Sequence, residues 1–157
     1  MGPFVPLHKS DQYPVVVRGL LCYGIVMDLS LIKQKLIPLL EKRSEIAIAY
    51  LFGSQASVTS SEQSDVDIAV YFSETYTVKR HNLLFSLSAD MMHALGTDHI
   101  DAHSLNDIRS PLLKYRIMQE GIVLFEREPY RIILEPRILN EYSDFLYLLK
   151  KHNLTTV

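Results

Sequence analysis

The chain has 157 residues and a formal net charge of −2, with 48% hydrophobic and 22% charged residues. This balance is typical of one globular domain that buries a core of its own. A net charge of this sign provides no basic surface for non-specific nucleic-acid binding. It therefore disfavours a polymerase that acts on long nucleic acid. We expect no direct nucleic-acid binding. The single cysteine, Cys22, excludes an internal disulfide and disfavours a structural zinc site. We therefore expect a reducing, cytoplasmic location.

The N-terminal 27 residues predict no clear element. They begin with several prolines, and Arg18 divides the hydrophobic residues that follow, so neither part reaches the ~20 residues of a membrane helix. Asp11 stands where a signal peptide carries positive charge, which disfavours an export signal. We interpret residues 1–27 as an N-terminal extension of uncertain order, ahead of one domain at 28–157, and expect no membrane association.

Hydrophobic spacing from residue 28 onward predicts alternating helices and strands. Asp28 or Ser30 is expected to cap the first helix. The core side of this helix is predicted to consist of Leu31, Leu36, Leu39 and Leu40. The continuous hydrophobic run at 46–52 is typical of a central strand covered on both faces, and a second strand is predicted at 65–72.

The second half of the chain continues the alternation. A helix is predicted at 78–95, ended by Gly96, and a short strand at 99–102. Ser110 followed by Pro111 predicts the start of another helix, because serine favours the N-cap and proline the first turn. Later elements are a stop at Gly121, a strand at 122–125, and a helical segment after 126 that reaches 151.

Two aspartates open the second predicted strand. Asp65 and Asp67 are two positions apart, so in a strand they project to the same side, roughly 6 to 7 Å apart. Such a pair suits Mg²⁺, which binds one or two carboxylates and fills its other positions with water and substrate phosphates. Gly53 and Ser54 end the preceding strand, where glycine lets the backbone approach a phosphate closely and serine can donate to its oxygens. The alternative interpretation is a serine-rich hairpin loop followed by two solvent-facing aspartates.

The pattern Gly-Ser, ten residues, Asp-x-Asp resembles the signature of the nucleotidyltransferase superfamily, whose fold is shared with DNA polymerase β. The resemblance implies an α/β (α+β) nucleotidyltransferase fold, with a mixed central sheet of about four strands and helices packed on it. It also assigns Gly53, Ser54 and Ser64 to nucleotide binding, and Asp65 and Asp67 to the metal ions and to catalysis.

A third aspartate is expected on the short strand at 99–102. Members of the superfamily carry an aspartate there, and Asp101 occupies the matching place. The resemblance implies that Asp101 holds the catalytic metal and takes the proton of the attacking hydroxyl; alternatively, it faces solvent on an edge strand. His99 and His103 lie two positions to either side, either as an accessory base or as exposed polar residues.

The order of these motifs, followed by the residues from Ser110 to Glu126, is similar to the minimal nucleotidyltransferase (MNT) antitoxins, which are encoded beside HEPN-domain RNase toxins. This resemblance implies a Mg²⁺-dependent enzyme that binds ATP, with two ions, and transfers AMP to a tyrosine hydroxyl of its HEPN toxin partner. Two alternatives stay open: a non-catalytic antitoxin that masks its partner sterically, and a nucleotidyltransferase acting on a small molecule. The hydrophobic side of the C-terminal segment is either a partner surface or a cover for the sheet.

The sequence also departs from the family pattern. Gln55 stands where relatives often carry a basic or aromatic residue, Val58 replaces a glycine, and Ser104 replaces a second acidic residue after Asp101. Phosphate charge must then be neutralised by the metal or by a basic residue elsewhere. The weak candidates for that role are Lys79, Arg80 and Arg116.

Overall fold

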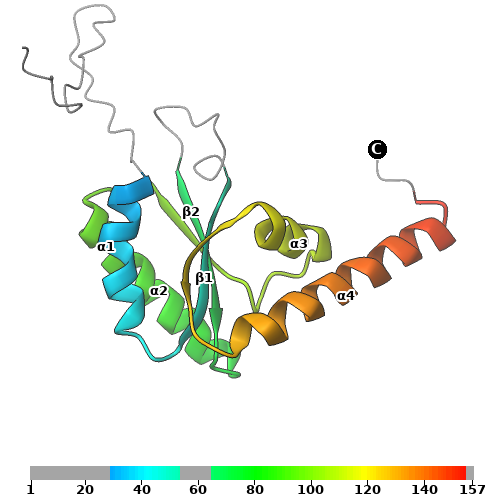
Figure 1. Ribbon diagram of the computed structural model, residues 1–157, viewed down its shortest axis with the longest axis horizontal. Helices are drawn as coiled ribbons and strands as arrows, with labels where there is room; N and C mark the ends of the chain where they lie inside the picture. The colour runs from blue at the N-terminus through cyan, green and yellow to red at the C-terminus, as the bar shows by residue number, and fades with distance from the viewer. Residues whose placement is uncertain (1–28, 54–64, 155–157) are drawn as a thin grey trace, which may run out of the picture.

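The computed structural model describes residues 29–53 and 65–154. This part of the chain forms four helices and four strands in an order close to that predicted from the sequence (Figure 1). The elements in chain order are α1 (Leu29–Glu41), β1 (Ile46–Phe52), β2 (Val66–Phe72), α2 (Thr77–Leu95), β3 (Ile100–Ser104), α3 (Pro111–Glu120), β4 (Ile122–Glu126) and α4 (Tyr130–Lys151).

The strands form one mixed sheet in the order β3-β2-β1-β4. β1 runs antiparallel to both of its neighbours, whereas β2 and β3 are parallel. A parallel pair needs a long crossover connection, which α2 provides. The predicted α/β fold with a mixed, four-stranded central sheet is confirmed.

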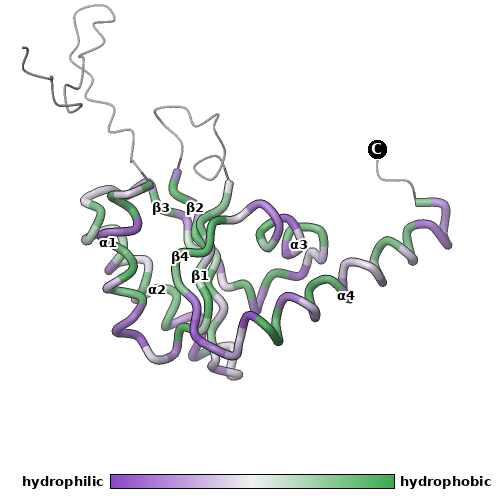
Figure 2. Tube along the Cα trace, viewed as in Figure 1, coloured by the Kyte–Doolittle hydropathy of each residue, from purple (hydrophilic) through white to green (hydrophobic). Residues whose placement is uncertain are grey.

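Helices cover both faces of the sheet. α1 and α2 lie on one side of it, and α3 with the first part of α4 lies on the other (Figure 1). β1 is buried from Ile46 to Leu51, as its uninterrupted hydrophobic run predicts for a central strand. Figure 2 shows the hydrophobic residues concentrated along the central strands.

The residues predicted to begin or end α2 and α3 occupy those positions in the structure. Gly96 caps α2 in the left-handed region with φ of 70°, and its amide donates to the Met92 carbonyl. Ser110 caps α3 by accepting a hydrogen bond from the Leu113 amide at 3.2 Å, and Pro111 follows in the first turn. Gly121 ends the same helix.

Two predictions need correction. Leu31 was expected in the core but is exposed, and Ile32 is buried in its place. The helix carries hydrophobic residues around much of its circumference, so its core-facing side could not be chosen by spacing alone. β3 begins one residue later than predicted and extends to Ser104, which places His103 inside the strand.

α4 changes character along its length. Its buried residues, Leu134 and Ile138, both lie in its first half and pack against the sheet. The second half projects away from the sheet (Figure 1), and exposes Leu146, Tyr147 and Leu148. Within the described residues, no helix combines the length and hydrophobicity that a membrane crossing requires.

Candidate functional site

Gly53 directly follows β1 and has a positive φ of 73°, a conformation that side chains disfavour. A Cβ atom at this position would lie 2.1 Å from Oδ2 of Asp67, far inside van der Waals contact. Glycine is therefore required here twice, by the backbone conformation and by the carboxylate that occupies the space. The Asp67 carboxylate therefore lies directly against the Gly53 backbone.

The strand register brings two of the predicted aspartates together. Asp67 pairs with Phe52 on β1 and with Asp101 on the parallel strand β3. Residues paired in register project to the same face of a sheet, so the Asp67 and Asp101 side chains lie side by side. Ala69, which follows on the same face of β2, belongs to the cluster packed under α3 and α4, so both carboxylates are on that side of the sheet.

Asp65 lies just before β2 and is exposed, and its Oδ1 is 3.1 Å from Nδ1 of His99. It is near enough to Asp67 to influence the pKa of that carboxyl group. Ser54 and Ser64, predicted to bind nucleotide, lie outside the described residues, as do Gln55 and Val58.

Among the described residues, no lysine or arginine forms an ion pair with Asp67. Burial raises the pKa of Asp67 above its ordinary value, and repulsion from Asp101 and Asp65 raises it further, while His103 lowers it. A divalent cation placed between these carboxylates would relieve both the desolvation and the repulsion.

The third member of this cluster is His103. Asp67, Asp101 and His103 each offer one ligand atom, and the three atoms lie within 4.8 Å of one another. Two carboxylates and an imidazole fit a divalent cation, so the residues present are compatible with the metal that the family signature implies. From the sequence, His103 was expected to be an accessory base or an exposed polar residue, and not a ligand. The sequence signal for the ligand role was its position two residues after Asp101, which places both side chains on the same face of a strand.

The basic residues considered for phosphate neutralisation have other contacts. Arg80 is buried and pairs with Asp107, and it also donates to the Thr75 and Glu74 carbonyls. Lys79 lies beside Glu74 and over the ring of Tyr76. Both residues therefore sit beyond the end of β2 that is opposite Asp67. Arg116 is exposed on α3.

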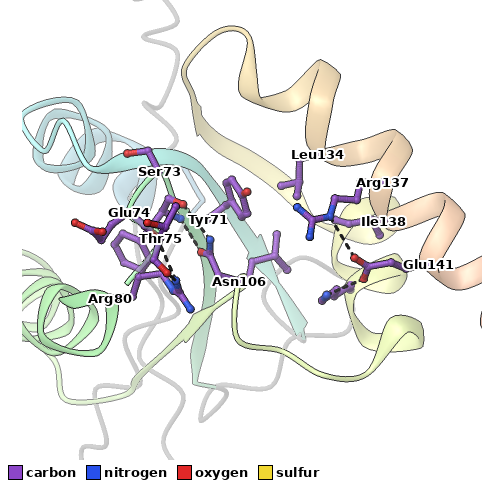
Figure 3. Close-up of a pocket in the computed structure, with 13 residues that line it drawn as sticks. Tyr71, Ser73, Glu74, Thr75, Arg80, Asn106, Leu134, Arg137, Ile138 and Glu141 are labelled. Carbon is purple, nitrogen blue, oxygen red and sulfur yellow. Dashed lines mark hydrogen bonds and ion pairs between the residues drawn. The ribbon is translucent and has the colours of Figure 1, made fainter. Parts of the chain in front are cut away.

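A cavity of about 260 Å³ also lies at that opposite end, between the end of β2 and α4 (Figure 3). Tyr71 and Asn106 line one side, and Leu134 and Ile138 of α4 line the other. The Asn106 side chain accepts from the Phe72 amide and donates to the Phe72 carbonyl, which fixes the wall of this cavity. The cavity is thus separate from the acidic cluster.

Residues 34–130 match the family described as Polymerase beta, Nucleotidyltransferase. The chain belongs to this family. The matched region contains every element from β1 to β4, and with them Gly53, Asp67 and Asp101. This nucleotidyltransferase is also 36% identical, over 96 residues, to a protein of Methanocaldococcus jannaschii that is provisionally named a protein adenylyltransferase; the match covers 61% of this chain and 97% of that protein.

Solved structures share the nucleotidyltransferase fold. One is a toxin–antitoxin crystal structure with AMP-PNP, at a TM-score of 0.63 and 22% identity, covering 76% of this chain and 93% of that one. Another is a tri-AMPylated HEPN toxin of Shewanella oneidensis in complex with its MNT antitoxin, at a TM-score of 0.59 and 21% identity, covering 78% and 92% of the two chains. At these identities the likeness establishes the fold of the present nucleotidyltransferase.

Proposed function

We propose that this nucleotidyltransferase transfers AMP from ATP to a tyrosine hydroxyl of a HEPN toxin and thereby neutralises it. The observation that carries the proposal is the register of β2 and β3, which places Asp67 beside Asp101 next to Gly53. The names of its relatives add support, since they describe a protein adenylyltransferase and antitoxins in complex with HEPN toxins.

In this proposal the carboxylates of Asp65, Asp67 and Asp101 hold the divalent cations, for which the family signature implies Mg²⁺. When bound, these ions neutralise phosphate charge and lower the pKa of an attacking hydroxyl. Gly53 leaves room for the carboxylate of Asp67 and for close approach of a phosphate to the backbone. Ser54 and Ser64 remain proposed contacts of the nucleotide.

The reaction itself is an in-line displacement at the α-phosphorus of ATP. The bond from the tyrosine oxygen to phosphorus forms as the bond to the bridging oxygen of pyrophosphate breaks, and pyrophosphate leaves. Asp101 is proposed to accept the hydroxyl proton, because its carboxylate is exposed at the edge strand where an acceptor can reach it. Positioning and electrostatics account for most of the catalysis in such transfers.

The second half of α4 supports a protein acceptor. Leu148 is 51% exposed and Tyr147 is 64% exposed on a helix that has left the sheet. The sequence left open whether this segment covers the sheet or docks a partner. Leu134 and Ile138 pack in the core, whereas Leu146, Tyr147 and Leu148 are exposed, and this exposure supports a partner-binding role for the second half of the helix. We propose the later residues as the toxin-binding surface.

The test is to incubate the protein with ATP, a divalent metal ion and a candidate HEPN partner protein, and then to weigh that partner by mass spectrometry. We expect mass increases of one or more adenylyl groups. Asp67→Asn should abolish them, whereas Asp98→Asn should not, because the Asp98 side chain is 93% exposed and is not part of the proposed site.

The same experiment separates the steric alternative. A toxin that is bound and inactive but carries no added mass, with Asp67→Asn neutralising as well as the native protein, would contradict AMP transfer. To test docking alone, Tyr147→Ser combined with Leu148→Ser should abolish the complex in size-exclusion chromatography. Thermal melting should stay cooperative because both side chains are exposed; an intact complex would contradict the surface assignment.

A further inference from the structure

His103 differs from an ordinary exposed histidine in where its ring is directed. It follows Asp101 by two residues in β3 and therefore projects from the same face of the sheet. Its Nε2 lies 3.2 Å from Oδ2 of Asp101. Its register partner on β2 is Ala69.

The ring is held in this position by Phe52. The two ring centroids are 5.7 Å apart with the planes tilted by 58°. Phe52 is also the register partner of Asp67, so one residue orients the imidazole beside the carboxylate cluster. Within residues 29–53 and 65–154, no aromatic ring packs on His99: its side chain is 69% exposed, against 40% for His103, and it contacts Asp65 and Asp98.

We propose that His103 is a metal ligand together with Asp67 and Asp101, and that this donor set favours a divalent transition-metal ion such as Mn²⁺ over Mg²⁺. The inference rests on the metal site of the proposed function and specifies which ion that site takes. Mg²⁺ binds oxygen ligands and keeps its waters, whereas imidazole nitrogen is a ligand of first-row transition ions. His103 would hold the ion through a ring nitrogen, and that bond would take the place of its contact with Asp101.

The direct test is pulsed electron paramagnetic resonance on the full chain loaded with Mn²⁺. A coordinated imidazole gives nitrogen couplings from the directly bound ¹⁴N atom. We expect these couplings in the native protein and in His93→Ala, a control at an exposed histidine on α2. They should be absent in His103→Ala and in His103→Gln, which keeps the size of the side chain if alanine weakens the packing on Phe52.

Metal affinity gives an independent readout. In titrations monitored by calorimetry, His103→Ala should weaken Mn²⁺ binding by about tenfold or more and Mg²⁺ binding by less than about threefold, because only the transition ion uses the nitrogen. A Mn²⁺-loaded native protein without nitrogen couplings, or an equal loss for both ions, would overturn the assignment of His103.

The two proposals fail differently. If Mn²⁺ binds through oxygen atoms alone and AMP is still transferred, the role of His103 is wrong and the proposed function stands. If the native protein binds neither ion in the presence of ATP, the metal site itself is wrong, and both proposals fall.

Discussion

The acidic residues at the two ends of the central sheet differ in whether a basic side chain neutralises them. Beyond the end of β2, Arg80 is only 8% exposed and donates to both oxygens of Asp107, which also accepts from Ser104. At the start of β2, Asp65 contacts the imidazole of His99 and Asp101 that of His103, and no lysine or arginine in the described part of the chain pairs with Asp67. The charge of Asp107 is therefore neutralised by Arg80, whereas no lysine or arginine of the described chain neutralises Asp67.

The pKa directions of the two carboxyl groups express this difference. The Arg80 guanidinium lowers the pKa of Asp107, while burial and the neighbouring Asp101 raise the pKa of Asp67. A lowered pKa means that the fold stabilises the ionised carboxylate, and a raised pKa means that it does not. We therefore expect substitutions at the Asp107 end to cost stability and substitutions at the Asp67 end to cost function.

The largest expected effect is on catalysis. Asp67→Asn keeps the shape of the side chain and removes its charge, so AMP transfer should fall by at least about a hundredfold. The melting temperature should stay the same or rise, because the repulsion from Asp101 disappears. Transfer of label from α-labelled ATP and a thermal melt measure the two quantities. Normal transfer, or a strong loss of stability, would contradict a catalytic role of Asp67.

The matching substitution at the other end is Asp107→Asn. It should lower the free energy of unfolding by roughly 2 to 3 kcal/mol, since Arg80 would lose its charged partner while Asp107 itself is partly exposed. Chemical denaturation measures this cost, and the transfer rate of the folded variant should be unchanged. Because the pKa of Asp107 is lowered, its contribution is present above the ordinary value of 3.8 and is lost as pH falls below it.

Sequence reasoning predicted the elements that local chemistry controls. The hydrophobic run of β1, the glycine that ends α2 and the Ser110-Pro111 start of α3 were all confirmed, because each depends on neighbouring residues alone. The predicted core-facing side of α1 was wrong at Leu31. Leu31 and Ile32 are adjacent hydrophobic residues, and the structure buries Ile32.

The site was harder to predict because it depends on strand pairing. The spacing of Asp65 and Asp67 does not show which residue stands beside them. The family resemblance pointed to Asp101, and the parallel register of β2 and β3 places it there. The role of Arg80 and the orientation of His103 were missed because their partners, Asp107 and Phe52, are far away in the sequence.

Substitutions of two glycines, Gly53 and Gly96, test whether the contact with Asp67 matters for AMP transfer. Gly53 and Gly96 both have positive φ, but an added Cβ would collide with Asp67 only at Gly53 and would meet nothing within 4 Å at Gly96. Gly96→Ala should cost about 1 kcal/mol of stability and leave transfer unchanged. Gly53→Ala should cost about as much from its backbone and also reduce transfer by about tenfold or more, because the Asp67 carboxylate must move. Equal transfer rates in the two variants would argue against the contact.

The smallest effect concerns Tyr50, buried in β1 between the two ends of the sheet. Burial, helped by the nearby Glu135 carboxylate, raises the pKa of Tyr50 to about 12. Because the unfolded chain ionises near pH 10, this residue stabilises the fold below pH 10, and that contribution is lost as pH rises toward 12. Tyr50→Phe should flatten this alkaline decline in denaturation measurements; an unchanged slope would assign the decline to other groups.

The central claim is that Asp67 and Asp101 jointly hold a metal-bound nucleotide. Calorimetric titration with a non-hydrolysable ATP analogue, in the presence and absence of a divalent metal ion, tests it most directly. We expect binding that requires the ion and is lost in the Asp67→Asn, Asp101→Asn double variant while that variant remains folded. Equal affinity in the native protein and the double variant would contradict it.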